Sequence, residues 1–240
     1  MTKIPKEVKI LAVIPARGGS KGIPKKNIAP VCGKPLIYYS IREALKSKKI
    51  DAVIVSTDSK EIAEVAKSYG VDVPFLRPKE ISRDDSVDLE FLQHAVSWVE
   101  KNRGWRPEIV LFLSPTTPSR SAKDIDDVLE FMIKNDADSV RTFFQPKSFS
   151  PFKMWTNEKG KPETFKPLFP EYVGVPRQKK PEYFMPVCLV YATKTEFIKN
   201  GRLWGDKLLG YLVPMEKYTD IDEPQDLEHA EQVLKRLKLA

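Results

Sequence analysis

The first 143 residues of the chain alternate between short apolar runs and amphipathic helical patterns, and this alternation restricts the possible folds more than any other feature. Runs rich in valine, isoleucine and leucine predict strands at 9–14, 52–56, 71–76, 109–113 and 139–143. Apolar residues at helical spacing predict helices at 35–47, 59–69, 88–101 and 122–134. Strands and helices in this order predict an α/β fold, in which helices cover both faces of a mostly parallel sheet.

A segment rich in proline and aromatic residues, 145–186, interrupts this pattern. It holds eight prolines and has no regular period, yet it is too apolar for a disordered linker. We therefore divide the chain into a main domain, residues 1–144 and 187–240, and an excursion from its sheet. The excursion needs a surface for its aromatic residues: either a second subunit, which would make a homodimer, or its own domain, over which it would fold as a lid. After it, the pattern predicts strands at 189–192 and 209–213, a short helix after Thr195 and a last helix at 224–238.

The composition narrows the functional classes. Lysine and arginine outnumber aspartate and glutamate by 40 to 33, which gives a net charge of +7. A basic chain can bind nucleic acid, but no long basic stripe alternates with aromatic residues here, so we expect a small anionic substrate and no nucleic acid. We expect neither a membrane span nor a signal segment, because no apolar run is long enough. Cys32 and Cys188 lack metal-ligand spacing, which predicts a reduced, cytoplasmic protein.

The stretch that follows the first predicted strand carries the strongest chemical signal. Residues 14–27 read Ile-Pro-Ala-Arg-Gly-Gly-Ser-Lys-Gly-Ile-Pro-Lys-Lys-Asn, with three glycines, four cations and no acid. Such a loop can bring backbone N–H groups and fixed positive charge to one point, and a polyphosphate is its natural ligand. The sequence has neither the Walker spacing nor Gly-x-Gly-x-x-Gly here, and a basic surface turn without a ligand is the alternative.

Polar residues also follow the other predicted strands. Ser-Thr-Asp-Ser occupies 56–59, an Arg-Pro pair begins at Arg77, and Ser-Pro-Thr-Thr-Pro-Ser-Arg occupies 114–120. Asp58 and Ser59 could serve only as helix caps. Because the carboxyl ends of parallel strands meet at one edge of a sheet, the set as a whole predicts a ligand site at that edge.

Asp220 and Asp222 are the sharpest feature near the end of the sequence. Alternate residues of an extended segment point to the same side, and two carboxylates on one side repel each other unless a cation lies between them. Mg²⁺ commonly binds one or two carboxylates together with substrate phosphates, so the pair is a candidate Mg²⁺ site. The alternative is that Asp222 or Glu223 caps the helix that starts at Pro224.

Together these motifs resemble those of the acylneuraminate cytidylyltransferase family, the CMP-sialic acid synthetases and their relatives. The resemblance runs over nearly the whole chain and rests on segments 14–27, 55–58, 76–78, 114–118, 176–178 and 220–222. It implies a Rossmann-like nucleotidyltransferase fold with a protruding dimerisation segment at 145–186, a requirement for Mg²⁺, and a homodimer. The implied reaction transfers CMP from CTP to an acidic, sialic-acid-like sugar and releases pyrophosphate.

The resemblance also implies a role for each matching position. Three cations of the glycine loop would act in catalysis at the phosphates: Arg17, Lys21 and Lys26. Further positions would bind the nucleotide: Ala16, Gly18, Ser20, Asn27, Arg77 and Asp88. The sugar would be bound by residues after the fourth strand and in the excursion: Ser114, Thr116, Arg177 and Gln178. Asp220 and Asp222 would hold Mg²⁺.

Three positions depart from the family pattern. Val187 stands where the family has an asparagine and Ser114 where it often has a glutamine, so we expect a less polar or differently substituted sugar. Asp88 replaces a serine near the nucleobase; it could accept from the amino group of cytosine, accept from guanine, or cap the next helix. Two alternatives therefore stay open: transfer from another nucleoside triphosphate, such as GTP, to a sugar phosphate, and a nucleotide-binding protein without catalysis.

Overall fold

A six-stranded sheet forms the centre of the molecule. The computed structural model describes residues 9–20, 22–147 and 150–240. The sheet has the strand order β10-β6-β9-β5-β1-β4, with β1 Ile10–Pro15, β4 Ala52–Ser56, β5 Ile109–Phe112, β6 Ser139–Phe144, β9 Met185–Lys194 and β10 Leu208–Leu212. β1 is parallel to β4 and β5, and β6 is parallel to β10, whereas β9 is antiparallel to both of its neighbours. The sheet is thus mixed but mostly parallel, as predicted.

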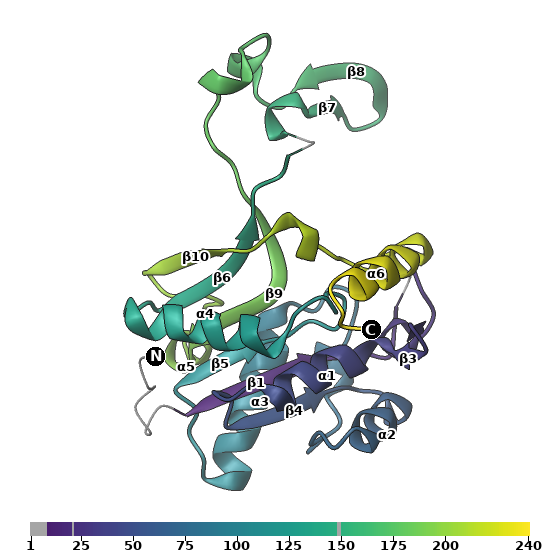
Figure 1. Ribbon diagram of the computed structural model, residues 1–240, viewed down its shortest axis with the longest axis vertical. Coiled ribbons are helices and arrows are strands. Elements are labelled where there is room, and N and C mark those ends of the chain that lie inside the picture. The colour runs from purple at the N-terminus through teal and green to yellow at the C-terminus, as the bar shows by residue number, and fades with distance from the viewer. Residues whose placement is uncertain (1–8, 21, 148–149) are drawn as a thin grey trace.

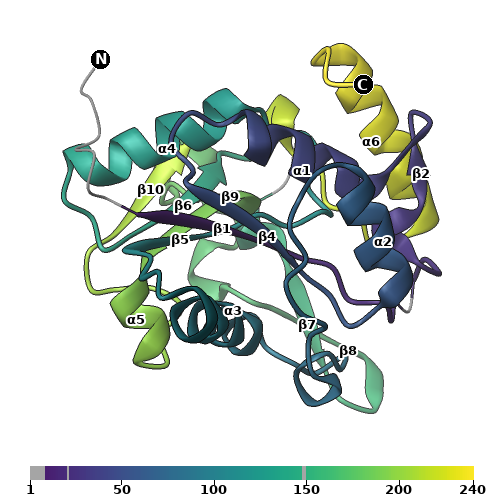
Figure 2. The same cartoon turned by 90° about the horizontal axis from the view of Figure 1, so that it is seen from below.

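Helices cover both faces of this sheet (Figures 1 and 2). One face carries α1 Leu36–Lys46, α2 Lys60–Ser68 and α4 Ala122–Lys134, and the other carries α3 Asp88–Arg103 and α5 Thr195–Lys199. The alternation of β1 explains both cores: Ile10, Ala12 and Ile14 are buried on the first face, while Leu11 and Val13 are buried on the second. The predicted α/β architecture is confirmed.

A smaller third core joins the two ends of the chain. α6 Pro224–Arg236 packs against the short hairpin of β2 Pro30–Val31 and β3 Lys34–Pro35. Ile23 from the glycine loop and Ile221 from the C-terminal part are both buried in this core. Consequently the first loop and the last segment of the chain lie beside each other. Of the described helices, none combines the length and the apolarity that crossing a bilayer requires.

The expected third strand, 71–76, is not formed. The segment follows the edge of β4 but makes only two isolated parallel bridges, Ile54 with Asp72 and Thr57 with Leu76. Pro74 lies between the bridged residues and has no N–H to donate, which explains why the ladder is interrupted. The segment still delivers Arg77 to the predicted edge, because the Arg77 N–H donates to the Thr57 carbonyl at 2.7 Å.

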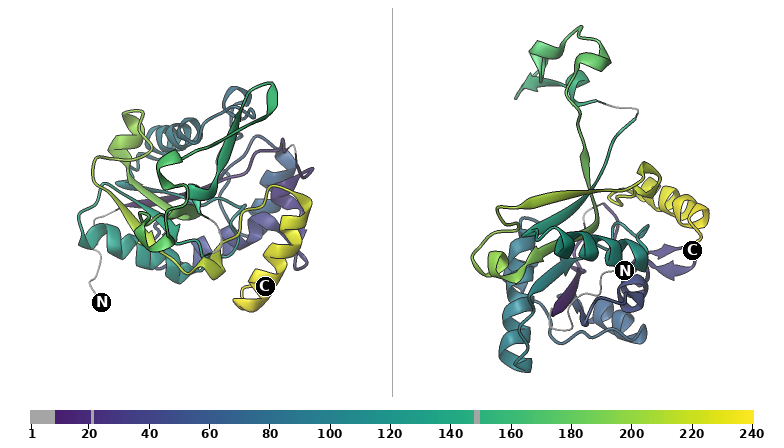
Figure 3. Two further views of the ribbon diagram at one scale, coloured as in Figure 1. Left: turned by 90° about the horizontal axis from the view of Figure 1, so that it is seen from above. Right: turned by 60° about the vertical axis from the view of Figure 1, so that its left-hand side comes forward.

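The segment between β6 and β9 projects away from the main body and does not fold over it (Figures 1 and 3). It contains an antiparallel hairpin, β7 Trp155–Glu158 and β8 Lys161–Pro167. Phe152 contacts three aromatic rings within the segment, those of Phe169, Tyr172 and Tyr183. The expectation of a lid is therefore wrong for this chain.

Single helical turns complete the described secondary structure. They are 3-10 turns at Lys26–Ile28, Lys79–Ile81, Pro151–Lys153, Pro170–Tyr172, Arg177–Lys179 and Met215–Lys217.

Candidate active site

A cavity of about 550 Å³ opens at the carboxyl ends of β1 and β5. Segments that lie far apart in the sequence share its wall. Nine of the residues predicted for the site line it: Arg17, Ser20, Lys26, Asn27, Arg77, Asp88, Ser114, Thr116 and Asp222. The predicted meeting of polar strand ends at one sheet edge has therefore produced a cavity whose wall holds both cations and carboxylates.

The glycine loop and the acidic segment are in direct contact. Lys26 Nζ donates to the Ile221 carbonyl at 2.7 Å and to Asp222 Oδ1 at 2.9 Å. A Cβ added at Gly22 would lie only 2.2 Å from the Asp222 carbonyl oxygen, so this close approach requires glycine. The Ile221 N–H donates to the Thr116 carbonyl at 3.1 Å, which ties the same segment to the end of β5. The basic and acidic groups of the cavity are thus held at a fixed separation.

Further hydrogen bonds shape the start of the loop. Arg17 Nη1 donates to the Arg83 carbonyl and pairs with Asp84, both at 2.8 Å, while buried Asn27 donates from Nδ2 to the Arg17 carbonyl at 3.0 Å. The Gly18 N–H donates to Asp58 Oδ1 at 2.8 Å. Asp58 therefore positions the loop and does not cap a helix.

Helix capping at α2 belongs to the next residue. Ser59 Oγ accepts from the Ile62 N–H at 3.3 Å, so the capping alternative holds for Ser59.

Asp220 and Asp222 flank Ile221, which is fully buried. The expected same-side arrangement of the two carboxylates follows from this alternation. Burial, and next the charge of Asp222, raise the pKa of Asp220, while Lys26 lowers it. The donor set fits a divalent cation, since the two carboxylates repel each other and a bound cation would offset that repulsion. Among the described residues no cluster of three or more histidine, cysteine or acidic side chains could hold a metal, so phosphate or water would complete the coordination.

The capping alternative for this acidic segment is only half correct. Glu223 occupies the N-cap position of α6, and Asp226 accepts hydrogen bonds from the backbone N–H groups of Asp222 and Glu223 at 2.9 and 2.7 Å. The Asp222 carboxylate itself pairs with Lys26. Asp222 is therefore free of the capping role and faces the cavity.

Arg77 and Asp88 form the part of the wall where the nucleobase was expected. Arg77 is buried, its guanidinium lies 5.5 Å from the Phe91 ring, and its Nε has no hydrogen-bond partner in the described part of the chain. Burial lowers the pKa of Arg77. A buried donor without a partner is costly, so an oxygen of a bound ligand would be stabilising there.

Asp88 begins α3, but Val87 occupies the N-cap position and Glu90 accepts from its N–H at 3.2 Å. The expectation that Asp88 caps the helix is therefore wrong. Its side chain borders the cavity. Burial raises the pKa of Asp88, while Arg141 and then Arg77 lower it.

Ser114 and Thr116 lie at the end of β5, where their hydroxyl oxygens are 2.8 Å apart. Arg120, which the sequence interpretation did not assign to the site, stabilises this turn by donating to the Ser114 carbonyl. Fully buried, it donates to the carbonyls of Ser114, Cys188 and Leu189 and to Ser40 Oγ. Its only sequence signal was its place in the polar run after the fourth predicted strand.

The other predicted residues that the structure describes do not line the cavity: Ala16, Gly18, Arg177, Gln178 and Asp220. Ala16 is buried, and its N–H donates to the Ser56 carbonyl at 2.9 Å. Arg177 and Gln178 are exposed on the projecting segment. Lys21 lies outside the described residues. Val187, at the position of the family's asparagine, is buried in the main core.

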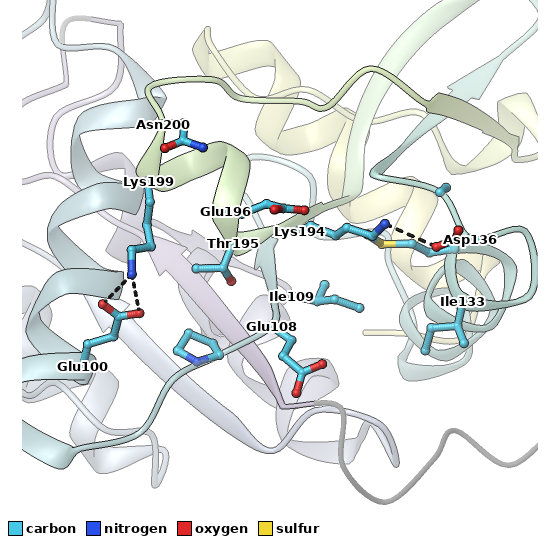
Figure 4. A pocket seen from close by; sticks show the side chains of 13 residues that line it. Glu100, Glu108, Ile109, Ile133, Asp136, Lys194, Thr195, Glu196, Lys199 and Asn200 are labelled. Carbon is cyan, nitrogen blue, oxygen red and sulfur yellow. Dashed lines mark hydrogen bonds and ion pairs between the residues drawn. The ribbon is translucent and has the colours of Figure 1, made fainter.

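A second cavity, of about 590 Å³, lies where β5 begins and β9 ends (Figure 4). It contains none of the predicted site residues. Its two lysines are already neutralised: Lys199 pairs with Glu100 at 3.0 Å, and Lys194 pairs with Asp138 at 2.9 Å and Asp136 at 3.3 Å. We therefore place the site in the cavity at the carboxyl ends of the strands.

Comparison with known proteins identifies the fold. By fold, the chain is similar to the solved structure of CMP:2-keto-3-deoxy-manno-octonic acid synthetase complexed with CTP, with a TM-score of 0.68 at 17% identity over 95% of this chain and 99% of that one. It is also similar to 4-diphosphocytidyl-2C-methyl-D-erythritol synthase from Anaerococcus prevotii, with a TM-score of 0.64 at 15% identity over 95% and 99% of the two chains. The fold is thus that of the Rossmann-like nucleotidyltransferases.

The sequence comparisons are more specific. A family model described as Cytidylyltransferase matches residues 11–201. The chain is 34% identical to a CMP-N,N'-diacetyllegionaminic acid synthase of Legionella pneumophila, over 95% of this chain and 97% of that protein. It is 31% identical to a pseudaminic acid cytidylyltransferase of Campylobacter jejuni, over 93% and 95%. It is 30% identical to an Escherichia coli N-acylneuraminate cytidylyltransferase over 92% of this chain, which spans about half (51%) of that enzyme. The chain belongs to the cytidylyltransferase family.

Proposed function

We propose that this protein transfers CMP from CTP to a hydroxyl group of an acidic nonulosonic sugar and releases pyrophosphate. The observation that carries the proposal is the contact of Lys26 with Asp222 at 2.9 Å, which places the cationic glycine loop and the acidic segment at one cavity. Relatives named for N-acylneuraminate, pseudaminic acid and legionaminic acid support this class of sugar.

The reaction that we propose concentrates negative charge on the leaving pyrophosphate. The sugar hydroxyl attacks the α-phosphorus of CTP while the bond to the β-phosphate breaks. Arg17 and Lys26 line the cavity and would stabilise the growing charge, because preorganised cations act most strongly where charge develops. Lys26 would exchange its contact with Asp222 for one with a phosphate. Neither His94 nor His229, the two histidines of the chain, lines this cavity, so we assign proton removal to no histidine.

We further propose that Asp220 and Asp222 hold Mg²⁺ together with oxygens of the triphosphate. When bound, the ion would neutralise phosphate charge and help to orient the leaving group. The contribution of the chain is to keep the two carboxylates on one side of an extended segment, which buried Ile221 anchors. Asp226 accepts hydrogen bonds from the backbone N–H groups at the start of α6, so neither Asp220 nor Asp222 is needed to cap this helix.

A homodimer is part of the same proposal. The projecting segment carries Arg177 and Gln178 away from its own main domain, and its exposed aromatic residues include Trp155 and Phe165. In a dimer, each projecting segment could bring these two polar residues to the sugar at the other subunit's cavity.

Cys32 and Cys188 are free thiols, which supports the cytoplasm as the place of action.

The first experiment measures pyrophosphate release. We expect release when the protein is incubated with CTP, Mg²⁺ and one member of a panel of nonulosonic acids, and less release with UTP, GTP or ATP. Release with none of the nucleotides and none of the sugars, by a protein that still binds CTP, would leave a nucleotide-binding protein without catalysis. Release with GTP and a sugar phosphate would favour the other alternative.

Two substitutions locate the reaction in this cavity. Arg17→Ala and Asp222→Asn should each lower kcat/KM at least a hundredfold, because each removes a charge that would act at the phosphates. Their free energies of unfolding should stay within about 1 kcal/mol of the wild type, since both side chains are partly exposed. Lys67→Ala, which removes an exposed cation paired with Glu64 on α2, is the control and should keep full activity. Wild-type rates for the first two variants would place the reaction elsewhere.

A further inference from the structure

Arg141 lies near the cavity, and two aromatic rings restrict its position. It lies on β6 directly opposite Tyr191 on β9. Its guanidinium is 4.5 Å from the centre of the Tyr191 ring and 4.7 Å from that of Trp204, so both rings restrict its position. Nevertheless, the guanidinium makes no hydrogen bond or ion pair with any residue in the described ranges. The rings thus fix the position of the guanidinium, and its charge can act on neighbouring groups.

Asp88 connects this arginine to the cavity. Asp88 lines the candidate active-site cavity and also a third, small cavity, whereas Arg141 and Tyr191 line only the small one. Arg77 also lines the candidate active-site cavity. Asp88 therefore shares one cavity with Arg77 and the other with Arg141.

A row of rings fixes the separation of the two arginines. Arg77 stacks on Phe91, Phe91 meets Phe112 at 5.5 Å, and Phe112 meets Tyr191 at 5.8 Å. Tyr191 in turn stacks on Arg141. Because aromatic contacts of this kind restrict ring positions, the two cations are held at a fixed separation.

An ionised carboxylate at a cavity wall only accepts hydrogen bonds. Cytosine presents an amino group at the position where uracil presents a carbonyl oxygen. A carboxylate facing that position would accept from cytosine and repel uracil, and an unpaired or repelled polar group is what makes a site selective.

We propose that Arg141 is a specificity-determining residue, whose positive charge keeps the Asp88 carboxylate a hydrogen-bond acceptor at the cavity wall and thereby makes the site prefer cytosine over uracil. This inference rests on the proposed function, since it takes the nucleotide to be the donor substrate. Arg141 acts through Asp88 and is a positioning residue, whereas Asp88 touches the base.

The pH dependence of nucleotide binding follows from the groups that face Asp88. These are Arg77 before α3, Arg141 on β6, and Cys188 and Tyr191 on β9. Both arginines lower the pKa of Asp88, and burial raises it. Removal of Arg141 therefore raises this pKa further. CTP affinity should then weaken as the pH falls, and should begin to do so at a higher pH in the variant than in the wild type.

The test compares binding of Mg²⁺-CTP and Mg²⁺-UTP by isothermal titration calorimetry, which needs no sugar, alongside pyrophosphate release. In Arg141→Met the preference for CTP should fall about tenfold or more through loss of CTP affinity, with UTP affinity unchanged or improved. Arg141→Lys should restore most of the preference, because it keeps the charge. Asp88→Asn should lose the preference and its pH dependence together. Arg202→Met removes another arginine that lies over a ring, that of Phe197, and should change nothing.

The outcomes separate the inference from the proposed function. An unchanged CTP preference in Arg141→Met, or an equal loss of both nucleotides, would overturn the inference even if pyrophosphate is released normally. A wild type that binds CTP and UTP equally would overturn it as well. Conversely, lost preference in the variants without pyrophosphate release from any sugar would keep the role of Arg141 and remove the proposed reaction. If Arg141→Met unfolds, Arg141→Lys and Asp88→Asn still decide through the pH profile.

Discussion

At the scale of single residues, the contact between Gly22 and Asp222 determines the shape of the site. The loop and the acidic segment approach so closely that a Cβ at Gly22 would meet the Asp222 carbonyl oxygen at 2.2 Å. Gly19 lies in the same loop, and a Cβ there would meet nothing within 4 Å. The two glycines look equivalent in the sequence, but only one of them is required by packing.

We predict that Gly22→Ala lowers the free energy of unfolding by about 1–3 kcal/mol, because the backbones must separate to admit the methyl group. The same separation moves Lys26 from Asp222, so kcat/KM for CTP should fall more than tenfold. Denaturant unfolding and pyrophosphate release are the measurements. Gly19→Ala is the matched control and should behave like the wild type. Equal effects of both substitutions would contradict the steric explanation.

At the scale of secondary-structure elements, Arg120 joins three of them. Its guanidinium donates to Ser40 on α1, to the carbonyl of Ser114 after β5 and to carbonyls of β9. Burial lowers the pKa of Arg120 to about 10. The buried cation is paired with carbonyl and hydroxyl oxygens, so each of its acceptors depends on it.

Arg120→Met should therefore lower the free energy of unfolding by about 3 kcal/mol or more, since several buried acceptors lose their donor. The loop with Ser114 and Thr116 should also loosen and raise KM for the sugar. Both quantities are measurable by thermal unfolding and steady-state kinetics. Exposed Arg106→Met is the control for loss of an arginine. A stability close to that of the wild type would show that water can replace the guanidinium.

Elements with a strong local pattern were predictable, and those that depend on neighbours were not. The four helices of the first part appear near their expected bounds, because amphipathic periodicity and capping residues such as Ser59 and Ser121 are local signals. The strand expected at 71–76 failed because one residue, Pro74, removes a ladder hydrogen bond at the edge of β4. β9 begins at Met185, earlier than expected, because pairing with β6 extends it.

At the scale of the whole molecule, the projecting segment is the outstanding feature. Phe165 on β8 is 68% exposed, and Trp155 on β7 is exposed as well. Exposed aromatic residues on a hairpin that extends from the body are typical of an interface. The apolar content of the segment was evident in the sequence, whereas its direction away from the body was not.

We predict that Phe165→Asp weakens the proposed dimer at least tenfold, because it places a charge in an apolar contact. Analytical ultracentrifugation over a range of concentrations measures the dissociation constant. Leu45→Asp, at a residue of α1 that is 48% exposed, is the control and should leave assembly unchanged. A monomeric wild type would contradict the prediction, and so would a Phe165→Asp variant with unchanged assembly.

The layers of the fold, the sheet edge at which the polar loops gather and the family of the chain could all be predicted from the amino-acid sequence. Those properties depend on periodicity, turns and short motifs, which neighbouring residues encode. Three further features became visible only in the folded molecule: Lys26 contacts Asp222, Arg120 donates to the carbonyl of Ser114 after β5, and Arg141 shares a small cavity with Asp88. These contacts join residues that are far apart in the chain, so they arise from the packing of whole elements and leave no local pattern.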